Sequence, residues 1–296
     1  MSRRSIVADE NQRIRFRRMH IDAHQHFWIY NGHEYGWIDD SMAALRRDFL
    51  PHDLAPELAA NGFDGSVLVQ TRQTLEETRW ILDLAEHNPS ILGVVGWADL
   101  RSPEIRSQLK ELTQHPKLVG IRHIVQGEPD DQFLLQPDFL RGISVLEEFN
   151  LAYDILIYTK HLPVAVDFVH RFPRQRFVLD HMAKPPIRSG QISQWAAGIR
   201  RLAEFPNVFC KVSGLVTEAD WENWKLEQIT PYLDVAFDAF GPDRLMIGSD
   251  WPVCLCAATY TQVMQLVKDY IQLLSPDSQA AVLGGNAARF WHLKAR

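Results

Sequence analysis

Short apolar runs recur along the whole chain and alternate with longer, more polar segments. Eight runs are rich in β-branched and aliphatic residues, and they end at His24, Gln70, Trp97, His123, Ile157, His181, Ser213 and Asp250. Successive ends lie 24 to 46 residues apart, which accommodates a strand, a loop, a helix and a return loop. Because strands joined by such crossovers run parallel, the pattern predicts eight parallel strands.

The segments between these runs are predicted to be helices, because apolar residues return at three- and four-residue steps. This periodicity is clearest over residues 80–85, 139–149 and 263–274. Thr74 precedes Glu77 by three residues, the spacing of a capping box that would begin the first of these helices. The alternation of strands and helices predicts an α/β fold, a single (β/α)8 TIM-type barrel.

The longest interval between strands, residues 27–65, exceeds a simple βα loop and is rich in aromatic residues. We expect a long loop insertion after strand 1 that forms a lid or rim over the barrel mouth. No Gly/Ser/Pro-rich linker divides the chain, and 296 residues suit one barrel. The predicted organisation is therefore an N-terminal extension at residues 1–18 and one barrel at residues 19–296.

Composition narrows the kind of partner. The net charge is -6 with both signs interspersed, so we expect no basic surface for nucleic acid or an anionic membrane. No apolar run approaches the ~20 residues that span a bilayer, which leaves a small molecule as the expected partner. The odd cysteine count and the absence of a secretory signal favour a cytoplasmic protein with spectator thiols, namely Cys210, Cys254 and Cys256.

Ionisable side chains follow several predicted strands, where barrel enzymes place their active sites. His24 and His26 are two residues apart, so a regular strand sends both side chains the same way. Asp250 closes the eighth strand, where burying a carboxylate without a partner is costly; capping of the next segment is the alternative. His181 ends the sixth strand. If that strand stays regular, Asp180 points to the opposite side and only His181 faces the interior, unless it is a neutral core histidine.

Further residues near strand ends are candidates for substrate binding. Those expected to contact a substrate are Arg122, His123, Tyr158, Lys184, Trp28, Trp97 and Trp251. Aromatic rings can pack on the faces of sugar rings, although filling the core is the alternative. The charged members could instead form structural ion pairs.

Several segments resemble a known family. MHIDAHQHFW resembles the first-strand signature of the amidohydrolase superfamily, and GSDWPVC resembles the eighth-strand aspartate segment of its lactonase branch. FVLDHMAKPPI and VFCKVSGLVTEADW are similar to L-fuconolactonase-type sugar lactonases, and the resemblance extends from His20 to the end of the chain. It implies a hydrolase of carbohydrate metabolism that acts on a carboxylic ester bond, converting a sugar lactone to the aldonic acid.

The resemblance also implies roles for the site residues. Asp250 matches the aspartate that activates water, and His24, His26 and His181 match the family's histidines. These four side chains could hold one divalent ion, expected to be zinc. The fifth strand ends DILIY, without the histidine or modifiable lysine of two-metal sites, and related dicarboxylate-lactone hydrolases work without metal. Both a metal-dependent and a metal-free reaction therefore fit the sequence, and no organic cofactor is predicted.

Ester hydrolysis needs a nucleophilic water, a polarised carbonyl and a proton for the leaving alkoxide. Asp250 suits the first task as general base, and the histidines suit the second. Alternatives on the same barrel are a metal-dependent amidohydrolase or decarboxylase, a metal-independent dicarboxylate-lactone hydrolase, and a binding protein. The complete set of site residues argues against the last. Arg122 and Lys184, with Arg72 as a third, are few cations for two carboxylates, so we expect neutral sugar lactones as substrates.

Overall fold

Eight parallel strands form the centre of the molecule. The computed structural model describes residues 19–293, and its strands follow one another around the sheet in chain order. They are β1 Ile21–Gln25, β2 Gly65–Val69, β3 Ile91–Gly96, β4 Leu118–Ile124, β5 Ala152–Leu156, β6 Phe177–Leu179, β7 Val208–Val212 and β8 Leu245–Ile247. All eight predicted strands are confirmed. The predicted extension at residues 1–18 lies outside the described residues.

The sheet closes where its first and last strands meet. The backbone N–H of Asp250 donates to the carbonyl of His24 at 2.8 Å, and the N–H of His26 donates to the carbonyl of Trp251 at 2.7 Å. Just below, the fully buried Asp22 of β1 accepts hydrogen bonds from Ser249 through its N–H at 2.9 Å and its hydroxyl at 2.6 Å. A buried carboxylate that is satisfied in this way joins β1 to the segment after β8.

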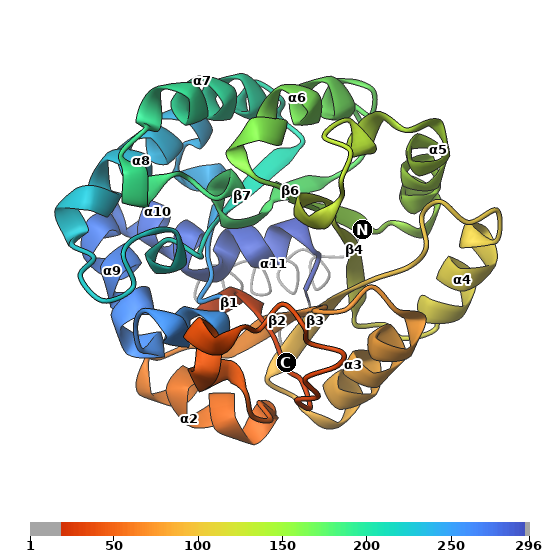
Figure 1. Cartoon of the computed structure of the whole chain (residues 1–296), viewed down its shortest axis with the longest axis horizontal. Helices are drawn as coiled ribbons and strands as arrows, with labels where there is room; N and C mark the ends of the chain where they lie inside the picture. Colours follow the sequence, from red (N-terminus) through yellow and green to blue (C-terminus); the bar gives the residue numbers. More distant parts are fainter. Residues whose placement is uncertain (1–18, 294–296) are drawn as a thin grey trace, which may run out of the picture.

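Helices surround the barrel (Figure 1). They are α2 Pro51–Ala60, α3 Leu75–His87, α4 Ile105–Leu112, α5 Pro137–Leu146, α6 Leu162–His170, α7 Ile192–Ala203, α8 Leu226–Phe240 and α9 Tyr260–Ile271, followed by α10 Pro276–Ala280 and α11 Asn286–Phe290. The periodic segments at 80–85, 139–149 and 263–274 fall in or next to α3, α5 and α9. Among residues 19–293, none of the helices has the length and apolar character needed to cross a membrane.

The predicted capping box at the start of α3 forms only in part. Thr74 caps the helix as predicted, since its hydroxyl oxygen accepts from the N–H of Glu77 at 3.1 Å. The Glu77 carboxylate does not return this bond; it accepts from the N–H groups of Thr71 at 3.0 Å and Arg72 at 2.7 Å. Glu77 is fully buried, so these bonds satisfy its charge and fix the loop after β2 at the barrel mouth.

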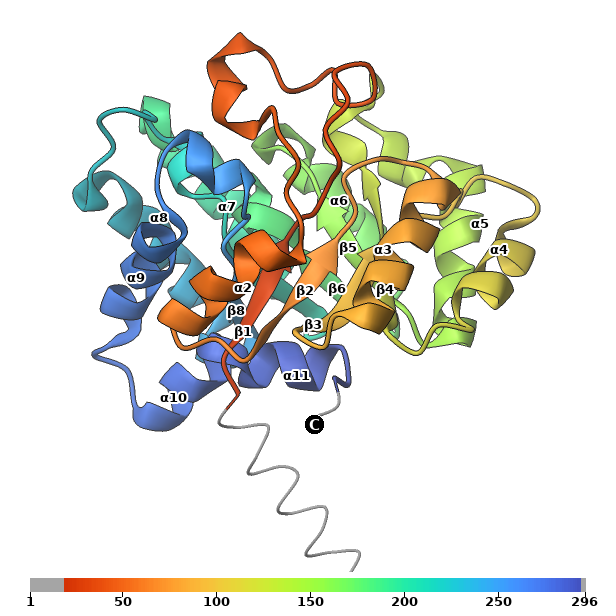
Figure 2. The same cartoon turned by 90° about the horizontal axis from the view of Figure 1, so that it is seen from below.

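The long segment after β1 forms the predicted rim. Residues 27–50, here called the mouth loop, rise above the carboxyl ends of the strands, whereas α11 lies across the opposite end (Figure 2). Trp28 pairs with Phe49 across the base of the mouth loop, and its indole N–H donates to the carbonyl of Arg47 at 2.9 Å. An ion pair of 2.5 Å between Arg72 and Glu34 joins this loop to the segment after β2.

The interior of the barrel is apolar toward the end that α11 covers. Small and β-branched side chains of the strands pack there with the last helix in a cluster that includes Ile21, Ala23, Val67, Val69, Val95, Ala152, Val178, Met246, Ala287, Ala288 and Trp291. Because this filling blocks the end that α11 covers, the polar residues of the interior face the mouth.

Candidate active site

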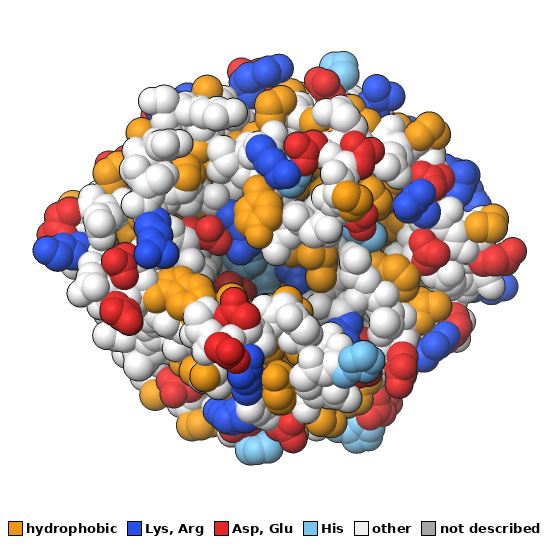
Figure 3. All heavy atoms as spheres, viewed as in Figure 1, with side chains coloured by type: hydrophobic (Ala, Val, Ile, Leu, Met, Phe, Trp, Pro, Cys, Tyr) orange, Lys and Arg blue, Asp and Glu red, His pale blue; other side chains and the backbone are white. Residues whose placement is uncertain are grey.

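Four ionisable side chains meet at the base of the mouth. The Oδ1 atom of Asp250 lies 3.3 Å from Nε2 of His26, 3.8 Å from Nε2 of His24 and 3.8 Å from Nε2 of His181. All four side chains are almost completely buried. Figure 3 shows the mouth as a hollow at the centre of this face, with histidine and basic side chains at its base. The structure therefore brings together the four residues that the sequence singled out.

A left-handed backbone conformation and a glycine place two of these side chains. Asp250 has φ +56°, so the chain turns immediately after β8 and directs the carboxylate toward the histidines. Gly248 lies directly against His24, since a Cβ added there would be 2.9 Å from the Cβ of His24. A side chain at this glycine would push the histidine from its position.

The end of β6 differs from the sequence-based expectation. We expected a regular strand in which Asp180 and His181 point to opposite sides. The strand ends at Leu179, and the residues from His181 to Lys184 all have positive φ near 50°. This left-handed turn breaks the alternation, and Asp180 and His181 both approach His24: Oδ1 of Asp180 is 3.4 Å from Nδ1 of His24, and the rings of His181 and His24 have centroids 4.4 Å apart. The expectation that Asp180 points away is therefore wrong.

Hydrogen bonds orient two of the imidazole rings. Nδ1 of His26 lies 2.7 Å from the carbonyl oxygen of Val69; a carbonyl only accepts, so this nitrogen carries a proton, and the contact turns Nε2 toward Asp250. Nδ1 of His181 lies 2.9 Å from the hydroxyl of Ser213. Contacts of this kind hold imidazoles in one orientation for catalysis or metal binding.

The charge states of the cluster suit acid–base chemistry. Burial lowers the pKa of His181 to about 4, and burial together with the nearby Lys211 lowers the pKa of His24 well below its usual value. Burial opposes ionisation of Asp250, but His181, His26 and His24 hold its pKa below the usual range. At neutral pH an ionised carboxylate therefore lies beside the neutral imidazoles of His24 and His181, which is the arrangement that a general base and hydrogen-bond donors require.

A layer of buried charges supports the cluster from below. Lys211 of β7 is fully buried, donates to Asp154 of β5, and lies 2.9 Å from Oδ1 of Asp180. Nη1 of Arg122 donates to Oδ2 of Asp180 at 3.0 Å. Sequence reasoning missed Asp154, Asp180 and Lys211. A signal was present for two of them, because a charged residue inside an apolar strand, as in AYDIL and VFCKV, is rarely buried without a partner.

The predicted substrate-binding residues lie at different positions relative to the cluster. Arg122 lies in the cluster, with Nη1 3.3 Å from Nε2 of His24. Lys184 and Tyr158 lie near each other, with the lysine nitrogen 6.0 Å from the centre of the tyrosine ring, and Tyr158 is 42% exposed. His123 is packed away from the cluster: its ring stacks on Phe133 with centroids 4.7 Å apart, and it contacts Glu128. The structure does not bring His123 to the site.

The three predicted tryptophans also differ in their environments. Trp28 is fully buried beneath the mouth loop, and Trp251 is buried against Phe27 and Phe49. Both fill the core, the alternative that the sequence left open. The partly buried Trp97 directs its indole nitrogen toward His123 at 3.4 Å, so it lies beside a residue that packs away from the cluster.

The donor set fits a divalent metal ion. There are two groups of residues in which the potential ligand atoms all lie within 4.8 Å of one another. One group is His24, Asp180 and His181, and the other is His24, His26 and Asp250. Imidazole nitrogens and carboxylate oxygens are ligand types that zinc favours. The orientation of His26 by the Val69 carbonyl is the kind of outer contact found around such sites.

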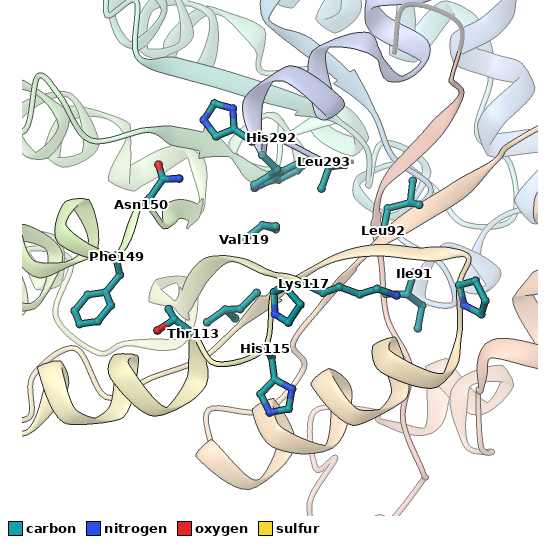
Figure 4. A pocket seen from close by; sticks show the side chains of 14 residues that line it. Ile91, Leu92, Thr113, His115, Lys117, Val119, Phe149, Asn150, His292 and Leu293 are labelled. Atoms are coloured by element: carbon teal, nitrogen blue, oxygen red, sulfur yellow. The ribbon is translucent and has the colours of Figure 1, made fainter. Parts of the chain in front are cut away.

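A second hollow of about 510 Å³ lies at the opposite end of the barrel (Figure 4). Its walls come from the starts of β3 and β4 and from the chain after α11, with Ile91, Leu92, Val119 and Leu293 among the apolar residues. Both groups of potential metal ligands within residues 19–293 lie at the mouth instead. Among the described residues, the possible metal ligands therefore lie near the carboxyl ends of the strands and not at this second hollow.

Comparison with known proteins agrees with this fold. The family model described as amidohydrolase matches residues 21–293, so the chain belongs to the amidohydrolase family. The resemblance noted in the sequence is thereby confirmed. The match extends over all eight strands and includes the four residues of the cluster.

Individual relatives are similar over almost their full lengths. The L-fucono-1,5-lactonase of Burkholderia multivorans is 42% identical over 286 residues, covering 93% of this chain and 96% of that protein. The L-fucono-1,5-lactonase of Burkholderia ambifaria is 40% identical over 277 residues, covering 92% and 95%. A crystal structure of an amidohydrolase from Burkholderia multivorans with bound zinc has a TM-score of 0.91 and 42% identity, covering 93% of this chain and 99% of that chain.

Proposed function

We propose that the protein hydrolyses a neutral sugar lactone of the L-fuconolactone type to the aldonic acid. The observation that carries this proposal is the Asp250 carboxylate, which lies within 3.8 Å of an imidazole nitrogen of each of three histidines at the barrel mouth. The similarity to two L-fucono-1,5-lactonases at 40 to 42% identity supports the substrate class. We place the reaction in carbohydrate metabolism on the same ground.

The site accounts for each step of ester hydrolysis. Asp250 accepts a proton from a water molecule, whose oxygen attacks the lactone carbonyl carbon. Imidazole N–H groups of the cluster donate to the carbonyl oxygen as negative charge develops on it. When the tetrahedral intermediate collapses, the bond between the carbonyl carbon and the ring oxygen breaks, and protonated Asp250 returns its proton to that oxygen. The single product is the open-chain hydroxy acid, because the ring oxygen stays attached to the same carbon chain.

The pairing of the cations at the mouth favours a neutral substrate. Each of the three cations predicted there has a carboxylate partner: Arg122 with Asp180 at 3.0 Å, Lys184 with Glu218 at 2.9 Å, and Arg72 with Glu34 at 2.5 Å. A carboxylate on the substrate would compete with these partners, whereas a hydroxyl can bond to a member of such a pair without separating the charges. This argues against the alternative of a dicarboxylate lactone.

A divalent ion, expected to be zinc, fits the same residues. His24, His26 and Asp250, whose ligand atoms lie within 4.8 Å of one another, are the residues that would hold it, with His181 as the fourth predicted ligand. When bound, such an ion supplies Lewis-acid polarisation of a carbonyl. A lactone is an activated ester, so we propose that hydrogen bonds from the histidines suffice for turnover and that the ion is dispensable.

A panel of sugar lactones tests the proposed function. The protein is assayed with a pH indicator against five- and six-membered aldonolactones and a pyrone dicarboxylate, before and after exhaustive chelation. We expect fastest hydrolysis of a neutral aldonolactone, with the rate retained after chelation. Faster hydrolysis of the dicarboxylate would contradict the substrate assignment. Activity that disappears on chelation and returns with zinc would contradict the metal-free reaction.

A further inference from the structure

A left-handed stretch of backbone carries His181 into the site. The residues from His181 to Lys184, here called the His181 turn, all have φ between +50° and +58°. Residues with a side chain disfavour this conformation because the Cβ atom approaches the following carbonyl oxygen, whereas glycine adopts it readily. None of the four residues is glycine, so contacts from the surrounding structure must hold the turn in place.

One short hydrogen bond reaches this turn from the outer ring of helices. The indole N–H of Trp195 on α7 donates to the carbonyl oxygen of Met182 at 2.7 Å. Both residues are fully buried, and α7 lies outside β6 and β7 in the ring of helices (Figure 1). We propose that Trp195 is a positioning residue of the active site, which holds His181 beside Asp250 through the backbone of the His181 turn.

The sequence after the turn explains why the donor comes from another element. In a helical turn, a carbonyl accepts a hydrogen bond from the N–H three or four residues later. For Met182 these residues are Pro185 and Pro186, which have no N–H. The local backbone therefore cannot satisfy this carbonyl, and a buried carbonyl without a donor is unfavourable. The indole of Trp195 supplies the missing donor.

The packing of Trp195 fixes the direction of its N–H group. Its ring lies against the ring of Tyr232 on α8, with centroids 5.1 Å apart and 62° between the ring planes. Because the ring is fully buried between packed helices, it has few alternative rotamers. The N–H group is therefore a fixed point to which the carbonyl of Met182 is bound.

The other contacts of the turn act on different groups. Ser213 contacts the ring of His181, with 2.9 Å to Nδ1. The hydroxyl of Thr159 donates to the carbonyl of Lys184 at 3.2 Å and lies 3.4 Å from the preceding carbonyl. These contacts hold the first side chain and the last residues of the turn. The bond from Trp195 holds the carbonyl that directly follows His181.

The position of the turn is transmitted to the site through the packing of the imidazole. The ring of His181 lies against the ring of His24, with centroids 4.4 Å apart, and against Gly214, where an added Cβ would be 2.8 Å from Nδ1 of His181. A ring packed in this way cannot rotate to compensate for a shift of its backbone, so such a shift changes its distance from Asp250. The effect on turnover rests on the proposed function, whereas the position of His181 does not.

Removal of the indole N–H tests the proposal. Trp195→Phe keeps an aromatic ring and removes the donor. Tyr232→Phe is the matched control, because it removes a hydroxyl that donates to the carbonyl of Pro186 at 3.1 Å, beyond the left-handed residues, and keeps the ring that packs on Trp195. We expect Trp195→Phe to lower kcat about tenfold and the control to leave kcat unchanged. We expect a smaller change in KM, because Thr159 still holds Lys184. An unchanged kcat in Trp195→Phe, or an equal loss in both variants, would overturn the proposal.

NMR of the histidine rings measures the position of His181 without substrate. The full-length, chelated protein is labelled with 13C-histidine, and the His181 signals are identified by their loss in His181→Asn. We expect these signals to shift in Trp195→Phe and to stay in place in Tyr232→Phe. Unchanged His181 signals in Trp195→Phe would contradict the positioning role. If the signals shift as expected but the wild-type protein hydrolyses no lactone, the proposed function fails and this inference stands.

A glycine in the turn provides a rescue that a general loss of packing would not show. Ala183 has φ +58°, and Ala183→Gly removes one methyl group and relieves the left-handed strain at this residue. We expect Ala183→Gly to raise the kcat of Trp195→Phe about fivefold; no recovery in the folded double variant would overturn the proposal. If Trp195→Phe does not fold, benzothienylalanine at position 195, which keeps the shape of indole and lacks the N–H, replaces it in all three measurements.

Discussion

The backbone N–H of Asp250 donates to the carbonyl oxygen of His24 at 2.8 Å, so the proposed general base and a neighbouring histidine are also hydrogen-bonded through their main chains. This bond lies where the first and last strands meet. The contacts that close the barrel therefore also bring the residues of the cluster together. A change that opens the β1–β8 seam is expected to remove activity even when every site residue is present.

Replacing Asp250 tests the proposed general base. Asp250→Asn keeps the size of the side chain but removes its ability to accept a proton, and we expect lactone hydrolysis to fall at least about a hundredfold while the fold is retained. The measurements are kcat/KM and the circular dichroism spectrum. Asp277→Asn, at an exposed position on α10, is the matched control. Near-normal turnover of the Asp250 variant would remove this residue from the mechanism.

Ser213 is expected to matter through His181. Its hydroxyl lies 2.9 Å from Nδ1 of that histidine, and outer contacts of this kind typically change activity by about 10- to 100-fold when removed. We expect Ser213→Ala to lower kcat within that range and to change the unfolding temperature little. Ser189→Ala, at an exposed position, serves as the control. An unchanged kcat would mean that packing alone orients His181.

Neutralising Glu218 is expected to change substrate preference. Glu218→Gln removes the carboxylate that lies 2.9 Å from Nζ of Lys184 and leaves a positive charge near the mouth. We expect KM for a lactone that carries one carboxylate to fall by up to about fivefold, the scale of a partly exposed ion pair. KM for a neutral lactone should not improve. Glu111→Gln, which removes the surface partner of Arg79, should change neither value.

The stability of the metal-free protein is expected to decrease in mild acid. Burial lowers the pKa of His181 to about 4 from 6.5. Between these pH values the unfolded chain binds a proton at this histidine and the folded protein does not. The contribution of neutral His181 to the free energy of unfolding is therefore complete above pH 6.5 and is lost as the pH falls toward 4. The free energy of unfolding should fall by about 1.4 kcal/mol per pH unit from this group.

Urea unfolding at several pH values across that window provides the measurement, with His181→Gln for comparison. The variant should show a shallower pH dependence than the wild-type protein, and His24, whose pKa burial also lowers, accounts for part of what remains. Identical slopes for the two proteins would show that His181 titrates normally in the folded state.

Local patterns in the sequence determined the architecture and most of the cluster. Apolar runs and helical periodicity reflect the strand and helix geometry of each segment, so they predict the eight strands, the helices and the single barrel without knowledge of distant contacts. The position of His24, His26 and Asp250 at strand ends then follows, because parallel strands present their carboxyl ends at one face of a barrel.

The tertiary structure decided which side chains the charges would meet. The left-handed turn after β6 brought Asp180 to the site, and the pairing of Arg122 and Lys184 with carboxylates changed their expected roles. Lys211 and Asp154, each in an otherwise apolar strand, became partners only when β5 and β7 were brought to either side of β6. Periodicity is a local property of the backbone, whereas the energy of a buried charge depends on the neighbours that barrel closure brings together. For this reason the sequence alone did not reveal these pairs of charged residues.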